Sequence, residues 1–166
     1  MPTALILLTP QFSFEMLSLP PTLPEFQMKY YKSACYSCGQ VQNIASALCL
    51  LCGITLCYGP AKCVPAIEGM LSSHSRLHEG GQCVFINLQE ATIILIGNNG
   101  SSAKFESPYR TKYGEMYTGY NKNTHEYLLD EEGGGLAQLR SLQQSYKNFE
   151  LCNRVLAQRT NPDSKF

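Results

Sequence analysis

Near the C-terminal end of the chain, apolar residues recur at spacings of three and four. Such a stripe is typical of one buried face of an amphipathic helix, so we expect a helix over residues 136–158. Asp130, Glu131 and Glu132 lie just before it, where negative charge favours a helix N-terminus. The stripe consists of Leu136, Leu139, Leu142, Tyr146, Phe149 and Leu156. We expect the stripe to be buried against its own domain, and a partner-binding helix is the alternative.

Two short runs before this helix have the composition of β-strands. Residues 84–88 and 91–96 are rich in Val, Ile and Leu, and turn-forming residues follow at 97–101. We therefore predict a β-hairpin over residues 84–96. The stretch at 97–135 is rich in tyrosine and glycine and has no long period, which favours an ordered loop region.

The first 28 residues are apolar and interrupted by five prolines, which favours an irregular segment over residues 1–28. The remainder divides into one domain at 29–158 and a short tail at 159–166. Residues 4–8 are the only apolar run near the start of the chain, and they are too few for a signal-peptide core or a membrane span. We therefore expect reduced thiols and no disulfide framework.

Composition narrows the classes of partner. The 166 residues carry 13 basic and 13 acidic side chains, so no overall charge attracts nucleic acid or an anionic membrane. Between residues 35 and 83 the only Lys or Arg residues are Lys62 and Arg76, too few for the phosphate contacts that nucleic-acid binding needs. We expect neither a nucleic acid nor a membrane as partner.

Cysteine is concentrated in one part of the chain. Residues 29–83 hold seven of the eight cysteines and two of the three histidines. Cys35 and Cys38 form one C-x-x-C-G motif, and Cys49 and Cys52 form a second. Two cysteines at this spacing can both face one zinc ion when the backbone between them turns tightly, and the following glycine relieves that turn.

Two further pairs complete a set of eight ligands. His74 and His78 are spaced i to i+4, so a helical turn can present both rings to one ion, and Cys57 and Cys63 form a looser pair. Linking the pairs one to three and two to four gives an interleaved arrangement over residues 35–83. Site one is then Cys49, Cys52, His74 and His78, and site two, on weaker grounds, is Cys35, Cys38, Cys57 and Cys63.

We expect one or two zinc ions in closed, structural sites. A catalytic zinc needs an open position and a nearby acid or base, and the only acidic residues from 35 to 83 are Glu68 and Glu79. No catalytic residue is predicted. The fold class is α+β: a small zinc-stabilised domain with a β-hairpin or small antiparallel sheet and a C-terminal amphipathic helix.

The remaining cysteines and the third histidine have simpler interpretations. Cys83, which follows two glycines, favours core packing, with a spare-ligand role as the alternative. Cys152 on the terminal helix is expected to be a small buried hydrophobe, and His125 a loop residue.

The cysteine-rich segment also resembles a known family. Residues 47–57, A-L-C-L-L-C-G-I-T-L-C, are similar to the start of the C-terminal zinc domain of the UBR-family ubiquitin ligases, the N-recognins of the N-degron pathway. The resemblance covers about residues 20–158. Further positions agree in order: His74, His78, the glycines 80–81, the strand 84–86, the motifs 107–109 and 113–115, and Gly119.

Some positions depart from the family pattern. His78 stands where the family usually has cysteine, and Leu71 where many members have one. Cys63 is single where many members have two adjacent cysteines, and the Cys35 and Cys38 pair resembles only some members. These departures leave site one intact and put the ligands of site two in question.

The resemblance implies a structural or regulatory domain of a ligase that ubiquitinates N-degron substrates for proteasomal degradation. Its partners would be the RING and UBR box regions of the parent ligase and, through them, a ubiquitin-conjugating enzyme and the substrates. This chain shows neither region, so we expect it to be inactive alone. A cytoplasmic location is implied, with the nucleus as a second.

Two alternatives remain open from the sequence. The chain could be a stand-alone zinc-binding adaptor without ubiquitin chemistry. It could also be a RING-like module in which Leu50, Leu51 and Ile54 form an apolar patch for a conjugating enzyme, although its ligand spacing differs from that of a standard RING.

Overall fold

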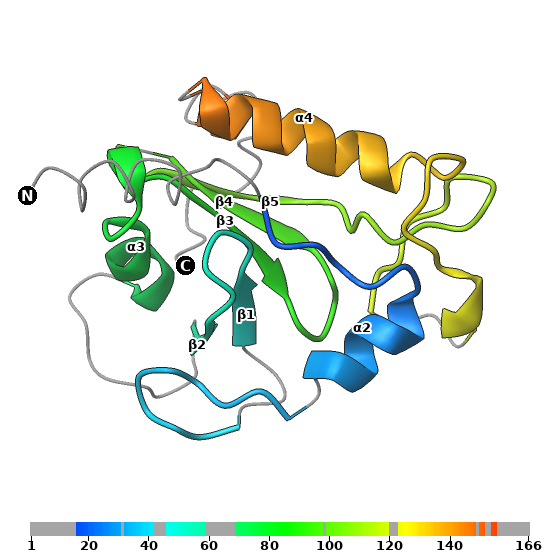
Figure 1. The fold of residues 1–166 in the computed structure, drawn as a ribbon, viewed down its shortest axis with the longest axis horizontal. Coiled ribbons are helices and arrows are strands. Elements are labelled where there is room, and N and C mark those ends of the chain that lie inside the picture. The colour runs from blue at the N-terminus through cyan, green and yellow to red at the C-terminus, as the bar shows by residue number, and fades with distance from the viewer. Residues whose placement is uncertain are drawn as a thin grey trace, which may run out of the picture.

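The computed structural model describes residues 16–30, 32–41, 46–58, 69–97, 99–119, 123–148, 150–151 and 154–155. Within them a five-stranded antiparallel sheet is combined with helices (Figure 1), which confirms the α+β class. The strands are β1 (Ser46–Cys49), β2 (Thr55–Cys57), β3 (Cys83–Asn87), β4 (Ile93–Ile96) and β5 (Ser102–Phe105), in the order β2-β1-β3-β4-β5. The helices are α2 (Leu23–Tyr30), α3 (Met70–Ser75) and α4 (Gly135–Lys147), with 3-10 turns η1 (Glu79–Gly81) and η2 (Thr124–Glu126).

The sheet is buried on both faces, because side chains alternate between two separate clusters. On β3, Val84 and Ile86 belong to the larger cluster, whereas Cys83 and Phe85 belong to the smaller one. All five residues of β3 and all four of β4 are buried. Because both faces are buried, the sequences of these strands are continuous apolar runs and do not alternate between apolar and polar residues.

The larger cluster lies between the sheet and most of the helical structure. It receives Leu23 and Phe26 from α2 and Leu142 and Tyr146 from α4. In Figure 1, α4 extends along the top of the sheet and α2 lies at the lower right. Tyr109 is fully buried among them and its hydroxyl donates to the Pro20 carbonyl at 2.8 Å, which fastens the chain before α2 to the core.

The smaller cluster covers the other face of the sheet. It combines Leu71 of α3, Phe85 and Ile94 with buried cysteines of three strands and of the first C-x-x-C turn. Figure 1 shows α3 beside the β1–β2 hairpin, on the side away from α2. Within the described part of the chain, the helix over this face is the short α3, and four of the ten buried residues of its core are cysteines.

The predicted elements are present with altered bounds. The hairpin predicted over 84–96 is formed by β3 and β4. It lies within a larger sheet that also contains β1 and β2 of the cysteine-rich segment, which were not predicted as strands. The predicted loop region contains β5 and η2, and α2 begins within the segment expected to be irregular.

The predicted C-terminal helix is shorter than expected. Helix α4 ends at Lys147, and Asn148 caps it by donating to the carbonyls of Gln144 and Tyr146. The helix that we predicted to continue to residue 158 is therefore interrupted at this cap, although Leu151 and Val155 beyond it are still buried in the larger cluster. Phe149 and Leu156 of the predicted stripe lie outside the described residues, as do most of residues 1–28 and the tail.

Among the described residues, no helix combines the length and apolar character needed to cross a membrane.

Gly135, the first residue of α4, lies against the backbone of Pro108 in the loop before the helix. A Cβ at this position would lie 1.9 Å from the Pro108 carbonyl oxygen. We expect Gly135→Ala to destabilise the domain by about 3 kcal/mol, since backbone must move to accept the methyl group. The change would be measured as a lower urea midpoint.

Gly134 supplies the matched control. Its φ is +86°, but a Cβ there would meet only the Arg110 guanidinium at 3.4 Å. Gly134→Ala should therefore cost only the left-handed penalty of about 1–2 kcal/mol. Equal urea midpoints for the two variants would contradict the close approach at Gly135.

Candidate metal centre

The two C-x-x-C-G motifs form turns with the same backbone geometry. In the turn between β1 and β2, the Gly53 N–H donates to the Cys49 carbonyl at 2.9 Å, and in the earlier turn the Gly39 N–H donates to the Cys35 carbonyl at 2.8 Å. The φ values of Gly53 and Gly39 are +82° and +74°, in the left-handed region that favours glycine. Each turn therefore needs the glycine that follows its second cysteine.

The histidines come from α3 and the turn after it. His74 lies in the last turn of α3, and its ring packs edge-on against Phe85 with centroids 5.9 Å apart. His78 lies past the end of the helix with extended backbone, so the pair is not held on one continuous helix as its spacing suggested. The His78 N–H donates to the Ser75 carbonyl at 3.1 Å, and this bond continues the turn far enough for both rings to face the same point.

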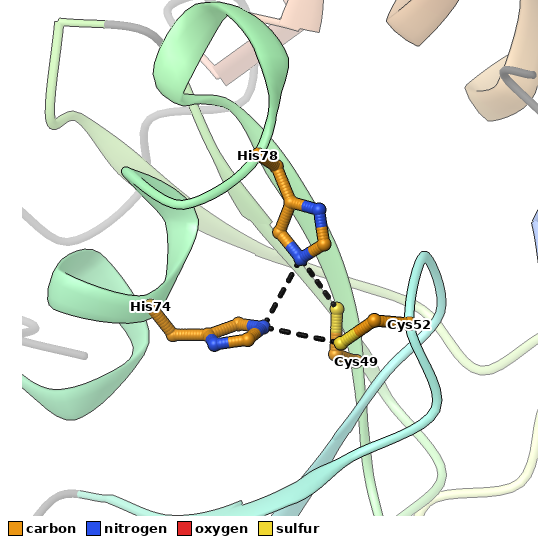
Figure 2. A group of neighbouring side chains, drawn as sticks. All are labelled: Cys49, Cys52, His74 and His78. Carbon is orange, nitrogen blue, oxygen red and sulfur yellow. Dashed lines mark hydrogen bonds between the residues drawn. The ribbon is translucent and has the colours of Figure 1, made fainter. Parts of the chain in front are cut away.

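Site one brings its four side chains together, as Figure 2 shows. Their ligand atoms all lie within 4.8 Å of one another. The Nε2 atoms of His74 and His78 are 3.1 Å apart, and Cys49 Sγ lies 3.4 Å from His78 Nε2. Cys52 Sγ lies 3.4 Å from His74 Nε2.

These separations fit a tetrahedral ion. Zn–S bonds of about 2.3 Å and Zn–N bonds of about 2.0–2.1 Å place neighbouring ligand atoms about 3.4–3.8 Å apart. The measured 3.1–3.4 Å is close to that range, and the donor set of two thiolates and two imidazoles is one that zinc favours. Cys49 and His74 are buried whereas Cys52 is exposed, so the group lies at the edge of the core.

Site two has three of its four predicted residues in the described part of the chain. Cys57 Sγ lies 3.5 Å from Cys35 Sγ and 3.9 Å from Cys38 Sγ, close to the roughly 3.8 Å expected between sulfurs on one zinc. The Cys57 N–H also points at Cys35 Sγ, 3.4 Å away. Cys63, the fourth predicted ligand, lies outside the described residues.

The two groups interleave along the chain as the spacing predicted. Site two joins the first C-x-x-C turn to β2, and site one joins the second C-x-x-C turn to α3 and the turn that follows it. In the β1–β2 register, Ser46 pairs with Cys57, so Cys49 and Cys57 stand at opposite ends of the hairpin. The structure thus brings seven of the eight predicted residues together in two groups of four and three, each of which could hold a metal ion.

The thiols of the two sites differ in acidity. The hydrogen bond from Cys52 lowers the pKa of Cys49, but the adjacent Cys83 and burial outweigh it and raise that pKa to about 12. The pKa of Cys52 is also raised, first by its hydrogen bond with Cys49 and then by burial. Burial raises the pKa of Cys35, but backbone hydrogen bonds from Cys38, Cys57 and Ser37 outweigh it and lower the pKa to about 6.

Other candidate residues have more ordinary places. His125 is an exposed residue of η2, which agrees with the loop position expected for it, and Cys152 lies outside the described residues. Leu50 is fully buried, and Leu51 and Ile54 are half-buried against the core. The apolar patch of a RING-like module is therefore not present as proposed, because its first member is a core residue.

The sequence favoured core packing for Cys83, with a spare-ligand role as the alternative, and the structure buries it beside site one. Its Sγ lies 3.4 Å from Cys49 Sγ, and both side chains are fully buried. The alternation of Cys83 and Phe85 on one face of β3 was visible in the sequence. The strand opposite them was not, since β1 was not predicted.

Comparison with known proteins assigns the chain to a family. The family model described as Proteolysis_6 C-terminal matches residues 1–131. E3 ubiquitin-protein ligase UBR1 of Homo sapiens is 28% identical over 88 residues, which are 51% of this chain and 5% of that protein. UBR1 of Mus musculus matches to the same extent. The match therefore spans only a small part of these relatives, and no solved structure matches the chain.

Removal of one ligand should empty site one. We expect His78→Ala to lower the bound zinc by one ion per chain. Loss of an outer hydrogen-bond partner of a ligand costs roughly 10–100-fold in metal affinity. The zinc affinity of His78→Ala should fall by more than this, because His78 is itself a ligand. Metal analysis of the purified protein measures this. His125→Ala, which removes an exposed histidine far along the chain, is the control, and equal zinc content in both variants would refute the ligand set.

Metal binding at site one should depend steeply on pH. The raised pKa values of Cys49 and Cys52 keep both thiols protonated at neutral pH without metal, whereas a bound ion requires both thiolates. Binding therefore releases two protons, and raising the pH favours it. We expect the affinity to rise about 100-fold from pH 7 to pH 8. Cobalt titration followed by visible absorption at both pH values measures the slope, and an unchanged affinity would contradict the assignment.

Proposed function

Because the chain belongs to the family described as Proteolysis_6 C-terminal, we propose that it forms the structural zinc domain at the C-terminal end of a UBR-type ubiquitin-protein ligase. The family is the C-terminal region of such ligases. In this proposal the parent ligase ubiquitinates proteins with N-degrons for proteasomal degradation, in the cytoplasm and also in the nucleus.

The interleaved arrangement of sites one and two is the observation that carries the structural role. Each site connects segments that are distant in sequence, and together they lie on the face of the sheet that α3 covers in the described part of the chain. A structural zinc can contribute on the order of 10 kcal/mol to folding, which suits a face with a small apolar cluster. We therefore assign zinc to site one and, with Cys63 as fourth ligand, to site two.

Saturated coordination supports a role without catalysis at the metal. Site one already offers two sulfurs and two imidazole nitrogens, so a tetrahedral ion there has no open position for water or substrate. Transfer of ubiquitin would then take place elsewhere in the parent, where a RING recruits the conjugating enzyme and a UBR box reads the substrate. This domain would contact those regions rather than the substrate.

A stand-alone zinc-binding adaptor is the second candidate. It is favoured by the two buried clusters, which could give the domain a core of its own without the parent ligase. The two proposals differ in the size of the protein in the cell, because the isolated chain has a mass of 18.5 kDa and the matched relatives are far longer.

An antibody against the exposed face of α4 can distinguish them. We expect it to detect a protein much larger than 18.5 kDa and to precipitate ubiquitin-transfer activity towards a peptide with a destabilising N-terminal residue. The purified 166-residue chain alone should discharge a ubiquitin-charged conjugating enzyme no faster than the blank. A band at 18.5 kDa only would favour the adaptor, and discharge above the blank by the isolated chain would contradict a purely structural domain.

A further inference from the structure

Cys83 forms an additional contact on the inner side of site one. It is the first residue of β3, and its Sγ lies 3.4 Å from Cys49 Sγ. Both side chains are fully buried. Cys83 is outside the group of four whose ligand atoms lie within 4.8 Å of one another, so it contacts one ligand of the site rather than completing the tetrahedron.

Strand register fixes this contact. Cys49 pairs with Phe85 across β1 and β3, and alternation places Cys83 on the same face two residues earlier. Cys83 itself pairs with Ile96 of β4, so its backbone is held at the start of β3, the central strand of the sheet. The cysteine is therefore presented to Cys49 by three paired strands and not by a loop.

The direction of the hydrogen bond follows from the chemistry of a loaded site. The raised pKa of Cys49 beside Cys83 belongs to the metal-free chain, in which either thiol can donate the hydrogen of this contact. A metal ion bound to Cys49 displaces the proton of that thiol and leaves Cys83 as the donor. The carbonyl oxygen of Val84 also lies near Cys83 Sγ, but at 3.9 Å it is a poorer acceptor. We propose that the Cys83 thiol donates a hydrogen bond to the Cys49 thiolate and thereby positions and stabilises this ligand of site one.

Burial and the charge of the acceptor strengthen the effect of this hydrogen bond. A thiolate in a dry core must find its partners within the protein, because water cannot supply them. Hydrogen bonds to charged acceptors are stronger than those between neutral groups. Loss of an outer hydrogen bond to a metal ligand typically costs roughly 10–100-fold in metal affinity. The inference rests on the proposed metal binding at site one and does not depend on the ligase assignment.

Three variants of the full chain test the role of Cys83. Cys83→Val keeps an apolar side chain of similar size but removes the donor, and Cys83→Ser keeps a donor. Ile96→Val is the packing control, since it removes one methylene from the neighbour of Cys83 in the same cluster. Zinc affinity at site one is measured by competition with a chromophoric chelator, and the thiolate-to-cobalt charge-transfer band reports on the sulfur itself.

We expect Cys83→Val to weaken zinc binding roughly tenfold and to move the cobalt band to longer wavelength, because a thiolate without its hydrogen bond gives up an electron more easily. Cys83→Ser should lie nearer to the wild type in both measurements, and Ile96→Val should leave the band in place. A band unchanged in Cys83→Val would overturn the proposal, as would a loss of one thiolate's charge-transfer intensity, which would make Cys83 a ligand. A wild-type chain without metal at site one would overturn the metal assignment itself.

Discussion

The antiparallel pairing of β1 with β3 decides both the core and the candidate metal centre. It sets Leu48 opposite Ile86 on the face covered by α2 and α4, and Cys49 opposite Phe85 on the other face. A shift of one residue would exchange these faces, because side chains alternate along a strand. The thiol of Cys49 would then point into the larger apolar cluster and would be separated from the histidines of site one.

The two faces of the sheet are stabilised in different ways. One face buries aliphatic and aromatic side chains under α2 and α4, including the fully buried Phe26 and Tyr109. Among the described residues, the other face is covered by two tight turns and the short helix α3, which offer few large apolar side chains. Metal coordination suits this second face because the energy of a few strong bonds can replace a broad contact area.

The family assignment rests on sequence similarity, whereas site one rests on the geometry of four side chains. The match to UBR1 covers 88 residues of this chain and 5% of that protein, so it shows a likeness to a small part of a much longer ligase. The geometry adds that Cys49, Cys52, His74 and His78 converge on one point. Cys83 adds a buried thiol behind Cys49, a feature of this chain that the ligand motifs do not contain.

Neighbouring residues in the sequence were enough to predict the two C-x-x-C-G turns, the histidine pair and the β3–β4 hairpin. These are short-range features, since each depends on residues a few positions apart. The strands β1, β2 and β5 could not be predicted in this way, because they are only 3 or 4 residues long and are stabilised by pairing with distant partners. Only the tertiary structure decided that α4 ends at Lys147 and that Cys83 lies against Cys49, because strand register and the packing of distant segments fix both.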